Sequence, residues 1–70
     1  MLSEKEQEVL KAIGKKNLIT MHDLRKIIGD GMQHTANNLI EKKLISEVRP
    51  IGTTCYVITG KGNKALHDIE

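Results

Sequence analysis

The segment GKGNKA, residues 60 to 65, is the part of this sequence whose residue types and spacing could hold a phosphate. It fits the pattern GxGxxA, in which glycines form a tight turn and bring backbone N–H groups and a helix N-terminus to the pyrophosphate of a dinucleotide. A dinucleotide site also needs a second parallel strand and an acidic residue about 20 positions further on. Because the sequence ends at Glu70, we expect a structural turn here and not a nucleotide site.

Other residues with catalytic or metal-binding chemistry are few and scattered. The single cysteine, Cys55, excludes an intrachain disulfide and a CxxC metal site, and this cysteine usage is typical of a reducing compartment. His22, His34 and His67 lack the spacing of metal ligands. The sequence shows neither a pair of carboxylates suited to acid–base work nor a nucleophile with a nearby base. We therefore expect no enzymatic activity, no catalytic residue, no bound metal and no cofactor.

Amide side chains gather in the segment MQHTANN, residues 32 to 38. Gln33 and Asn37 suit bidentate hydrogen bonds to adenine in the major groove of DNA. His34 and Thr35 can donate or accept at a base edge or a phosphate. The segment contains no arginine, which is the residue that most often reads guanine, so a polar, solvated helix face is the alternative interpretation.

Size and composition limit the classes of function. A chain of 70 residues forms one small domain, which seldom has room for both a core and an enclosed substrate pocket. With 39% hydrophobic residues, one Tyr and no Phe or Trp, the expected core is aliphatic, and stacking of single-stranded bases is disfavoured. The formal net charge of +2 permits binding to nucleic acid without requiring it. A charged N-terminal segment and the lack of an apolar run of ~20 residues predict a cytoplasmic protein with no membrane partner.

Local signals place the elements that position these side chains, beginning with a helix and a short strand. Ser3 and Glu6 form a capping box, S-x-x-E, which predicts a first helix over residues 4–13 with Gly14 as its stop. The apolar pair at 18–19 is long enough only for a minimal strand.

A second and a third helix are predicted next to each other. Thr20 and Asp23 repeat the capping pattern before a helix over residues 21–28. The short breaker GDG ends that helix, and its Asp30 is predicted to cap the third helix. The third helix is amphipathic over about residues 31–43, with the amide side chains on its outer face.

The last part of the chain has the pattern of a hairpin followed by a helix. Residues 44–49 and 53–59 are β-prone, and a proline and a glycine between them suit a turn between antiparallel strands. Thr59 is predicted to cap a short last helix that begins near residue 61. The order of elements predicts a single α+β domain over residues 1–70.

Two segments carry a resemblance to a known family. "LIEKKLI" at 39–45 and "YVITGKGNKAL" at 56–66 resemble the winged helix-turn-helix domains of prokaryotic transcription regulators, including the multiple-antibiotic-resistance and phenolic-acid-repressor kinds. The matching residues are Leu39, Glu41, Lys42, Leu44 and Ile45 in the first segment and Tyr56, Ile58, Thr59, Lys61 and Gly62 in the second. Lys43 stands where such families usually have a glycine. A non-glycine residue at positive φ costs about 1 kcal/mol, so we expect the third helix to end differently here.

The resemblance implies a winged helix, which is a three-helix bundle with a β-hairpin wing over about residues 44–59 and a short C-terminal helix. It implies that the recognition helix, about residues 31–43, enters the major groove of double-stranded DNA while the wing lies on the backbone. It also implies that Gly62 lets the chain turn sharply from the wing into the last helix. The expected base contacts are Gln33, His34, Asn37 and Asn38, and the expected phosphate contacts are Thr20, His22, Thr35, Lys42, Arg49 and Lys61.

The expected function is therefore that of a DNA-binding transcription regulator. We expect a homodimer, because two-fold pairing adds a second half-site to the few base pairs that one helix reads. The first and last helices are the expected dimer contact. The alternative is an interaction module that docks on a partner protein without binding DNA, which a nearly neutral third helix and the modest net charge favour.

Overall fold

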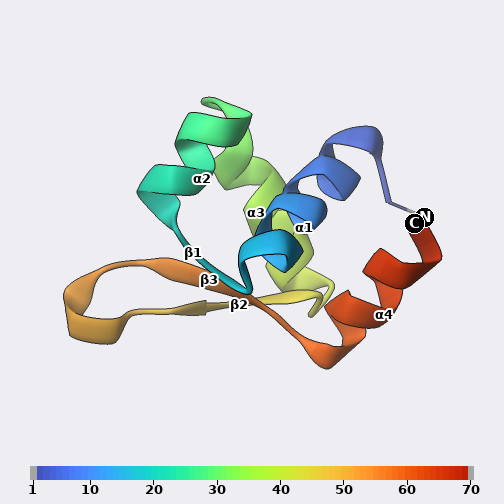
Figure 1. Cartoon of the computed structure of the whole chain (residues 1–70). Helices are drawn as coiled ribbons and strands as arrows, with labels where there is room; N and C mark the ends of the chain where they lie inside the picture. Colours follow the sequence, from blue (N-terminus) through green and yellow to red (C-terminus); the bar gives the residue numbers. More distant parts are fainter. Residues whose placement is uncertain (1, 70) are drawn as a thin grey trace.

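The computed structural model describes residues 2–69, which form an α+β fold with four helices and a three-stranded antiparallel sheet, as the sequence predicts. Figure 1 shows α1, α2 and α3 on one side of the sheet, a hairpin that projects from the body, and α4 at the opposite end. The elements in chain order are α1 (Glu4–Lys16), β1 (Leu18–Thr20), α2 (Met21–Ile28), α3 (Met32–Glu41), β2 (Ile45–Val48), a 3-10 turn (Pro50–Gly52), β3 (Cys55–Ile58) and α4 (Gly60–Ile69).

The sheet has β3 in its centre, with the strand order β1-β3-β2. Tyr56 in β3 pairs with Ile19 of β1 on one side and with Glu47 of β2 on the other. The short strand predicted at 18–19 is therefore an edge strand of the sheet. Its pairing with β3 connects the segment before α2 to the hairpin. None of the helices in the described part of the chain is long and apolar enough to cross a membrane.

The core is aliphatic around one aromatic ring. Apolar residues at helical spacing form one buried stripe on α1 and another on α3. These stripes and the ring of Tyr56, which comes from the sheet, pack into one hydrophobic cluster. The fully buried members include Val9, Leu10, Ile13, Leu24, Met32, Ala36, Leu39 and Tyr56. Cys55 points to the other face of β3, as strand alternation predicts, but it is also buried because this central strand has a neighbour on each side.

The first helix begins as predicted and ends later than predicted. The N–H of Ser3 donates to Glu6 Oε1 over 2.9 Å, and the N–H of Glu6 donates to Ser3 Oγ over 3.2 Å, which confirms the capping box. Gly14 does not stop the helix, which continues to Lys16. The glycine instead leaves room for α4, because a Cβ at this position would lie 2.5 Å from a methyl carbon of Leu66 in that helix.

The start of α3 differs from the prediction. Thr20 caps α2 as expected, with its hydroxyl oxygen 3.1 Å from the N–H of Asp23. Asp30 does not cap α3: the N-cap is Gly31, and no side-chain cap bond forms there among the described residues. The chain instead turns through Gly29, which has φ 105°, and the N–H of Met32 donates to the Gly29 carbonyl over 3.2 Å.

The end of α3 keeps the geometry of a glycine-terminated helix although a lysine stands there. The helix ends at Glu41, two residues before the predicted limit. Lys43 has φ 64°, and its N–H donates to the Ile40 carbonyl over 2.9 Å. The N–H of Leu44 donates to the Leu39 carbonyl over 3.0 Å, which completes a Schellman motif. The expectation that Lys43 makes the helix end differently is therefore wrong. The lysine adopts the left-handed backbone conformation in which glycine is usually found.

The GKGNKA segment forms the first turns of α4, which begins at Gly60. The N–H of Gly62 donates to Thr59 Oγ1 over 3.0 Å, which confirms the predicted cap, and the same hydroxyl lies 2.8 Å from the carbonyl oxygen of Lys43. A Cβ on Gly62 would overlap the carbonyl oxygen of Leu44. Gly62 is thus required for close contact between α4 and the start of β2, and its φ is not positive.

Candidate nucleic-acid interface

The outer face of α3 brings two of the predicted amide residues, Gln33 and Asn37, together. Since Met32, Ala36 and Leu39 anchor the inner stripe of the helix, the residues between them turn outward. His34 and Asn37 are exposed and Gln33 is half-buried. Gln33 Nε2 donates to Asn37 Oδ1 over 3.1 Å, which links the two amides one helical turn apart.

Tyr56 carries a polar group that is buried in the core. Its hydroxyl has no hydrogen-bond partner among residues 2–69. Burial raises the pKa of the Tyr56 phenol, while the side chain of Gln33 acts in the opposite direction; the charge of Glu47 raises this pKa and that of Arg25 lowers it. Glu47 is the residue of β2 that pairs with Tyr56 across the sheet. Strand alternation assigns a side chain to one face of a strand but does not show where its polar end lies.

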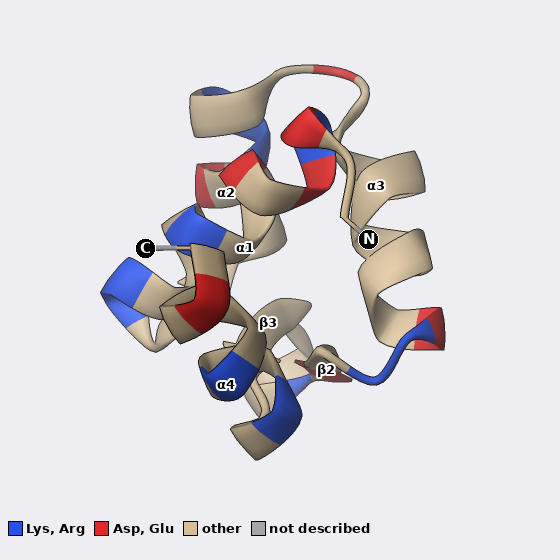
Figure 2. Cartoon of the chain, turned by 90° about the vertical axis from the view of Figure 1, so that its right-hand side faces the viewer, with Lys and Arg blue, Asp and Glu red and all other residues tan. Residues whose placement is uncertain are grey.

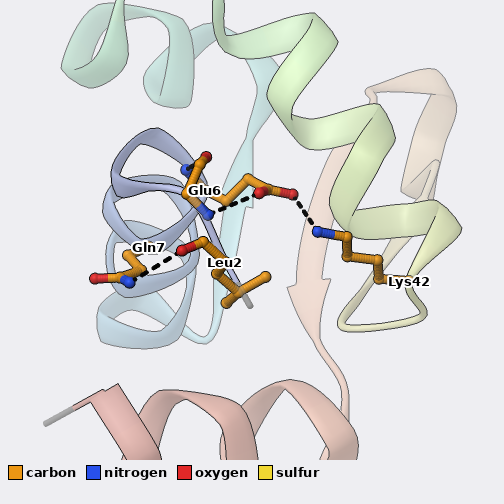
Figure 3. A network of polar contacts seen from close by, with 5 residues as sticks. Leu2, Glu6, Gln7 and Lys42 are labelled. Atoms are coloured by element: carbon orange, nitrogen blue, oxygen red, sulfur yellow. Dashed lines mark hydrogen bonds and ion pairs between the residues drawn. The ribbon is translucent and has the colours of Figure 1, made fainter.

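Two of the predicted contacts, Asn38 and Lys42, lie toward α1. Lys42 Nζ is 2.8 Å from Glu6 Oε2, and this ion pair joins the end of α3 to the first turn of α1 (Figure 3). The Lys42 ammonium, followed by the backbone N–H of Ser3, lowers the pKa of Glu6 to about 2. Asn38 borders the same shallow depression as this pair. Lys42 is thus engaged within the fold and is not a free phosphate clamp.

Thr35 is also turned away from the outer face. It is 6% exposed, and its hydroxyl donates to the Gly31 carbonyl over 3.4 Å, back along the helix. Its polar group is therefore used inside the fold, and the expected phosphate contact at Thr35 is not supported by its position.

The other predicted phosphate contacts lie at three separate places in the fold. Thr20 and His22 lie at the start of α2, where His22 is exposed and the Thr20 hydroxyl is occupied as a cap. Arg49 lies at the tip of the projecting hairpin with 69% of its side chain exposed, and its Nε is 3.7 Å from Glu47 Oε2. Lys61 is exposed on α4, at the end of the molecule opposite the hairpin tip (Figure 1). The fold does not bring Lys61 to the side of Arg49.

The hairpin tip also presents an apolar side chain. Ile51 is fully exposed, at 103%, and has φ 54°. A β-branched residue rarely adopts a left-handed conformation, so the backbone is strained at this position. The side chain makes no packing that offsets the strain.

Charge is unevenly distributed over the surface. Figure 2 shows α3 almost without charged residues until its end, whereas Lys and Arg occur on α1, α2 and α4. Between Met32 and Glu41 the only charged residue is Glu41 itself. The amide face is therefore polar and close to neutral, with cations only at its margins. No group of His, Cys, Asp or Glu side chains within residues 2–69 is arranged to hold a metal ion.

Comparison of the chain with family models, with curated proteins and with solved structures found no match. Any assignment of function to this chain therefore depends on the chemistry of the amide face and of the hairpin.

Proposed function

We propose that this protein is a DNA-binding transcription regulator with a winged helix-turn-helix fold. In this proposal α3 is the recognition helix that enters the major groove, and the β2–β3 hairpin is the wing that lies along the backbone. The order of three helices followed by a hairpin and the three-stranded sheet support the fold assignment. The resemblance of residues 39–45 and 56–66 to such domains supports it independently.

One observation carries the functional proposal: α3 bears a hydrogen-bonded amide pair, half-buried Gln33 and exposed Asn37, beside a projecting hairpin that carries an arginine. Amides match the donors and acceptors of base edges, whereas an arginine on the hairpin matches a phosphate. The proposed base contacts are Gln33, His34 and Asn37. The proposed phosphate contacts are His22, Arg49 and the backbone N–H groups at the start of α2.

Fluorescence anisotropy with labelled duplex DNA tests this proposal. The wild-type protein is titrated into mixed duplexes at low and moderate salt, and then into a duplex that it enriches from a randomised pool. Asn37→Ala is expected to weaken binding to the enriched duplex by about 1 to 3 kcal/mol and to leave binding to mixed DNA nearly unchanged. Asn63→Ala is the matched control, because Asn63 is an exposed asparagine on α4. Failure of the wild type to bind any duplex at low salt contradicts the proposal.

We propose that the regulator acts as a homodimer through α1 and α4. These helices pack against each other, and the half-buried side chains of Leu2, Ala65 and Ile69 line a shallow groove between them. A second copy that covers this apolar surface places two recognition helices about 10 bp apart on DNA. Sedimentation at high micromolar concentration, with and without DNA, is the test, and a monomer under both conditions contradicts dimer formation.

A protein-interaction module is the second candidate. The near-neutral face of α3 favours it, since Lys42 is paired with Glu6 and leaves few free cations close to the helix. In that case Gln33→Ala and Asn37→Ala abolish binding to a partner protein, while duplex DNA at low salt does not bind. The DNA titration therefore separates the two candidates.

A further inference from the structure

Ile51 at the tip of the β2–β3 hairpin is the large apolar side chain that the described part of the chain leaves most exposed. Its exposure is 103%, compared with 55% for Ile27 and 49% for Leu18. A single exposed apolar residue is common on protein surfaces and does not by itself indicate a contact. The conformation and the neighbours of Ile51 therefore decide whether it has a function.

The backbone of Ile51 has a conformation that isoleucine rarely adopts. Its φ and ψ are 54° and 35°, in the left-handed region that glycine and asparagine enter readily. Gly52 follows with φ 77°, and the N–H of Thr53 closes the turn by donating to the Pro50 carbonyl over 3.1 Å. The turn therefore combines backbone strain with full exposure of an apolar side chain. Strain of this kind is common where a residue contacts a ligand.

A cation lies close to this side chain in the hairpin. Arg49 has 69% of its side chain exposed, and its Nε is 3.7 Å from Glu47 Oε2. An exposed ion pair of this length holds an arginine only weakly. The hairpin that carries Ile51 and Arg49 projects from the body of the molecule (Figure 1). A ligand that fits this tip offers an apolar slot next to negative charge and is reached by a protruding loop.

The minor groove of duplex DNA has this combination of features. Two rows of phosphates border the groove, and an apolar side chain such as isoleucine can insert between neighbouring base pairs and partly unstack them. The inserted side chain kinks the duplex toward the major groove. Because β2 of the hairpin packs against α3, a bend in that direction curves the duplex around the proposed recognition helix.

We propose that Ile51 is a specificity-determining residue of the hairpin: it inserts at one base step of the minor groove, while Arg49 contacts a phosphate beside that step. This inference rests on the proposed DNA-binding function. TA and CA/TG steps are easily kinked, whereas A-tracts are stiff. The preferred duplex therefore carries a flexible step where the hairpin tip meets it, at base pairs that α3 does not touch.

The test uses the duplex that the wild type enriches from a randomised pool. In copies of this duplex the centre is kept, and one TA step in an otherwise stiff A-tract flank is moved outward by one base pair at a time. The wild type is expected to bind the copy with the TA step under the hairpin tip roughly tenfold more tightly than a copy with an uninterrupted A-tract. A fluorescent adenine analogue at that step is expected to brighten on binding, because such an analogue is quenched while it is stacked.

Ile51→Asn is the test variant, because asparagine adopts the left-handed conformation and lacks an apolar side chain. It is expected to melt no lower than the wild type, to lose both the preference for the TA step and the gain in fluorescence, and to keep the discrimination due to Asn37. Ile51→Leu keeps an apolar side chain and is expected to retain most of the preference. Ile27→Asn is the matched control, since it replaces another exposed isoleucine, in α2, and is expected to change neither readout.

The outcomes separate this role from the proposed function. Absence of duplex binding by the wild type at low salt rejects the proposed function and with it the role of Ile51. If the wild type binds its enriched duplex and Ile51→Asn shows the same flank preference, the insertion is rejected and the role of α3 is not. A loss of affinity in Ile51→Asn that is equal for all flanks also rejects the insertion, because the tip then touches DNA without parting a base step. Slower sedimentation of Ile51→Asn than of the wild type without DNA would instead assign the tip to a contact between copies of the chain.

Discussion

Lys42 at the end of α3 donates to Glu6 in the first turn of α1, with 2.8 Å between Nζ and Oε2. The other carboxylate oxygen, Oε1, accepts the N–H of Ser3 over 2.9 Å. A single carboxylate therefore closes the capping box of α1 and holds the end of α3 against it (Figure 3). Because Glu6 is 7% exposed, it would be costly to leave this charge without its partner.

Stability is expected to depend on pH through Glu6. The pKa of Glu6 is lowered from 4.5 to about 2, so its stabilising effect is complete above pH 4.5 and is lost as the pH falls toward about 2. Glu6→Gln is expected to lower the free energy of unfolding at pH 7 by about 1 to 2 kcal/mol, because solvent at the half-exposed Lys42 screens the pair. Urea unfolding between pH 2 and 7 measures both effects. Glu8→Gln is the control at an exposed position of the same helix, and equal losses in the two variants contradict this account.

Lys43→Gly is expected to stabilise the protein. Lys43 has φ 64°, where glycine has no steric penalty, so the expected gain in the free energy of unfolding is about 0.5 to 1 kcal/mol after the greater flexibility of the unfolded chain is counted. Lys64→Gly is the matched control: it places the same substitution at an exposed position inside α4, where a loss of about 1 kcal/mol is expected. If the positive φ of Lys43 is the cause, thermal unfolding shows that Lys43→Gly is more stable than the wild type and that Lys64→Gly is less stable.

Gly62→Ala is expected to destabilise the contact between α4 and β2. A methyl group there would overlap the Leu44 carbonyl oxygen and also lie 2.8 Å from a side-chain carbon of Ile58, so a loss of at least about 2 kcal/mol is expected. Gly60→Ala is the control, since a Cβ at that position would meet no atom within 4 Å apart from its chain neighbours and the backbone of its own helix. Chemical unfolding that finds the two variants equally stable would show that the packing of α4 is looser than described.

Salt dependence distinguishes the two exposed cations that the sequence assigns to phosphates. Arg49→Ala is expected to weaken binding to all duplexes alike and to flatten the slope of log K against log salt by about one unit per lost contact. Lys61→Ala is expected to leave the slope unchanged, because α4 lies at the end opposite the hairpin (Figure 1). A flatter slope in Lys61→Ala would show that Lys61 does contact a phosphate, contrary to this expectation.

Local chemistry explains which elements were predictable. The caps at Ser3, Thr20 and Thr59 follow from a hydroxyl and an N–H three residues away, and such contacts depend on little beyond the segment itself. The hairpin follows from the turn residues between two β-prone segments. The order of elements and most of the inner faces were therefore predictable from the sequence.

The errors have tertiary causes. Glycine often ends a helix, but Gly14 lies inside α1, where the absence of a side chain leaves room for Leu66. The pairing of Lys42 with Glu6 joins residues far apart in the chain, which no local pattern indicates. The burial of the Tyr56 hydroxyl without a hydrogen-bond partner also depends on how the helices pack on the sheet. The candidate site was thus predicted by residue type, while the engagement of its members inside the fold was not.

Ile51 is exposed and has a left-handed backbone conformation, so selection for stability and selection for DNA binding are expected to favour different residues at this position. Its strained backbone is a cost to folding that no contact in the described chain offsets. A library randomised at this codon and sorted only for resistance to heat is expected to converge on glycine or asparagine, which adopt positive φ readily. The same library sorted for retention on DNA retains isoleucine if the tip touches the duplex. The difference in amino-acid frequencies between the two sorted pools at this one codon would then measure how much the ligand, and not the fold, constrains the tip.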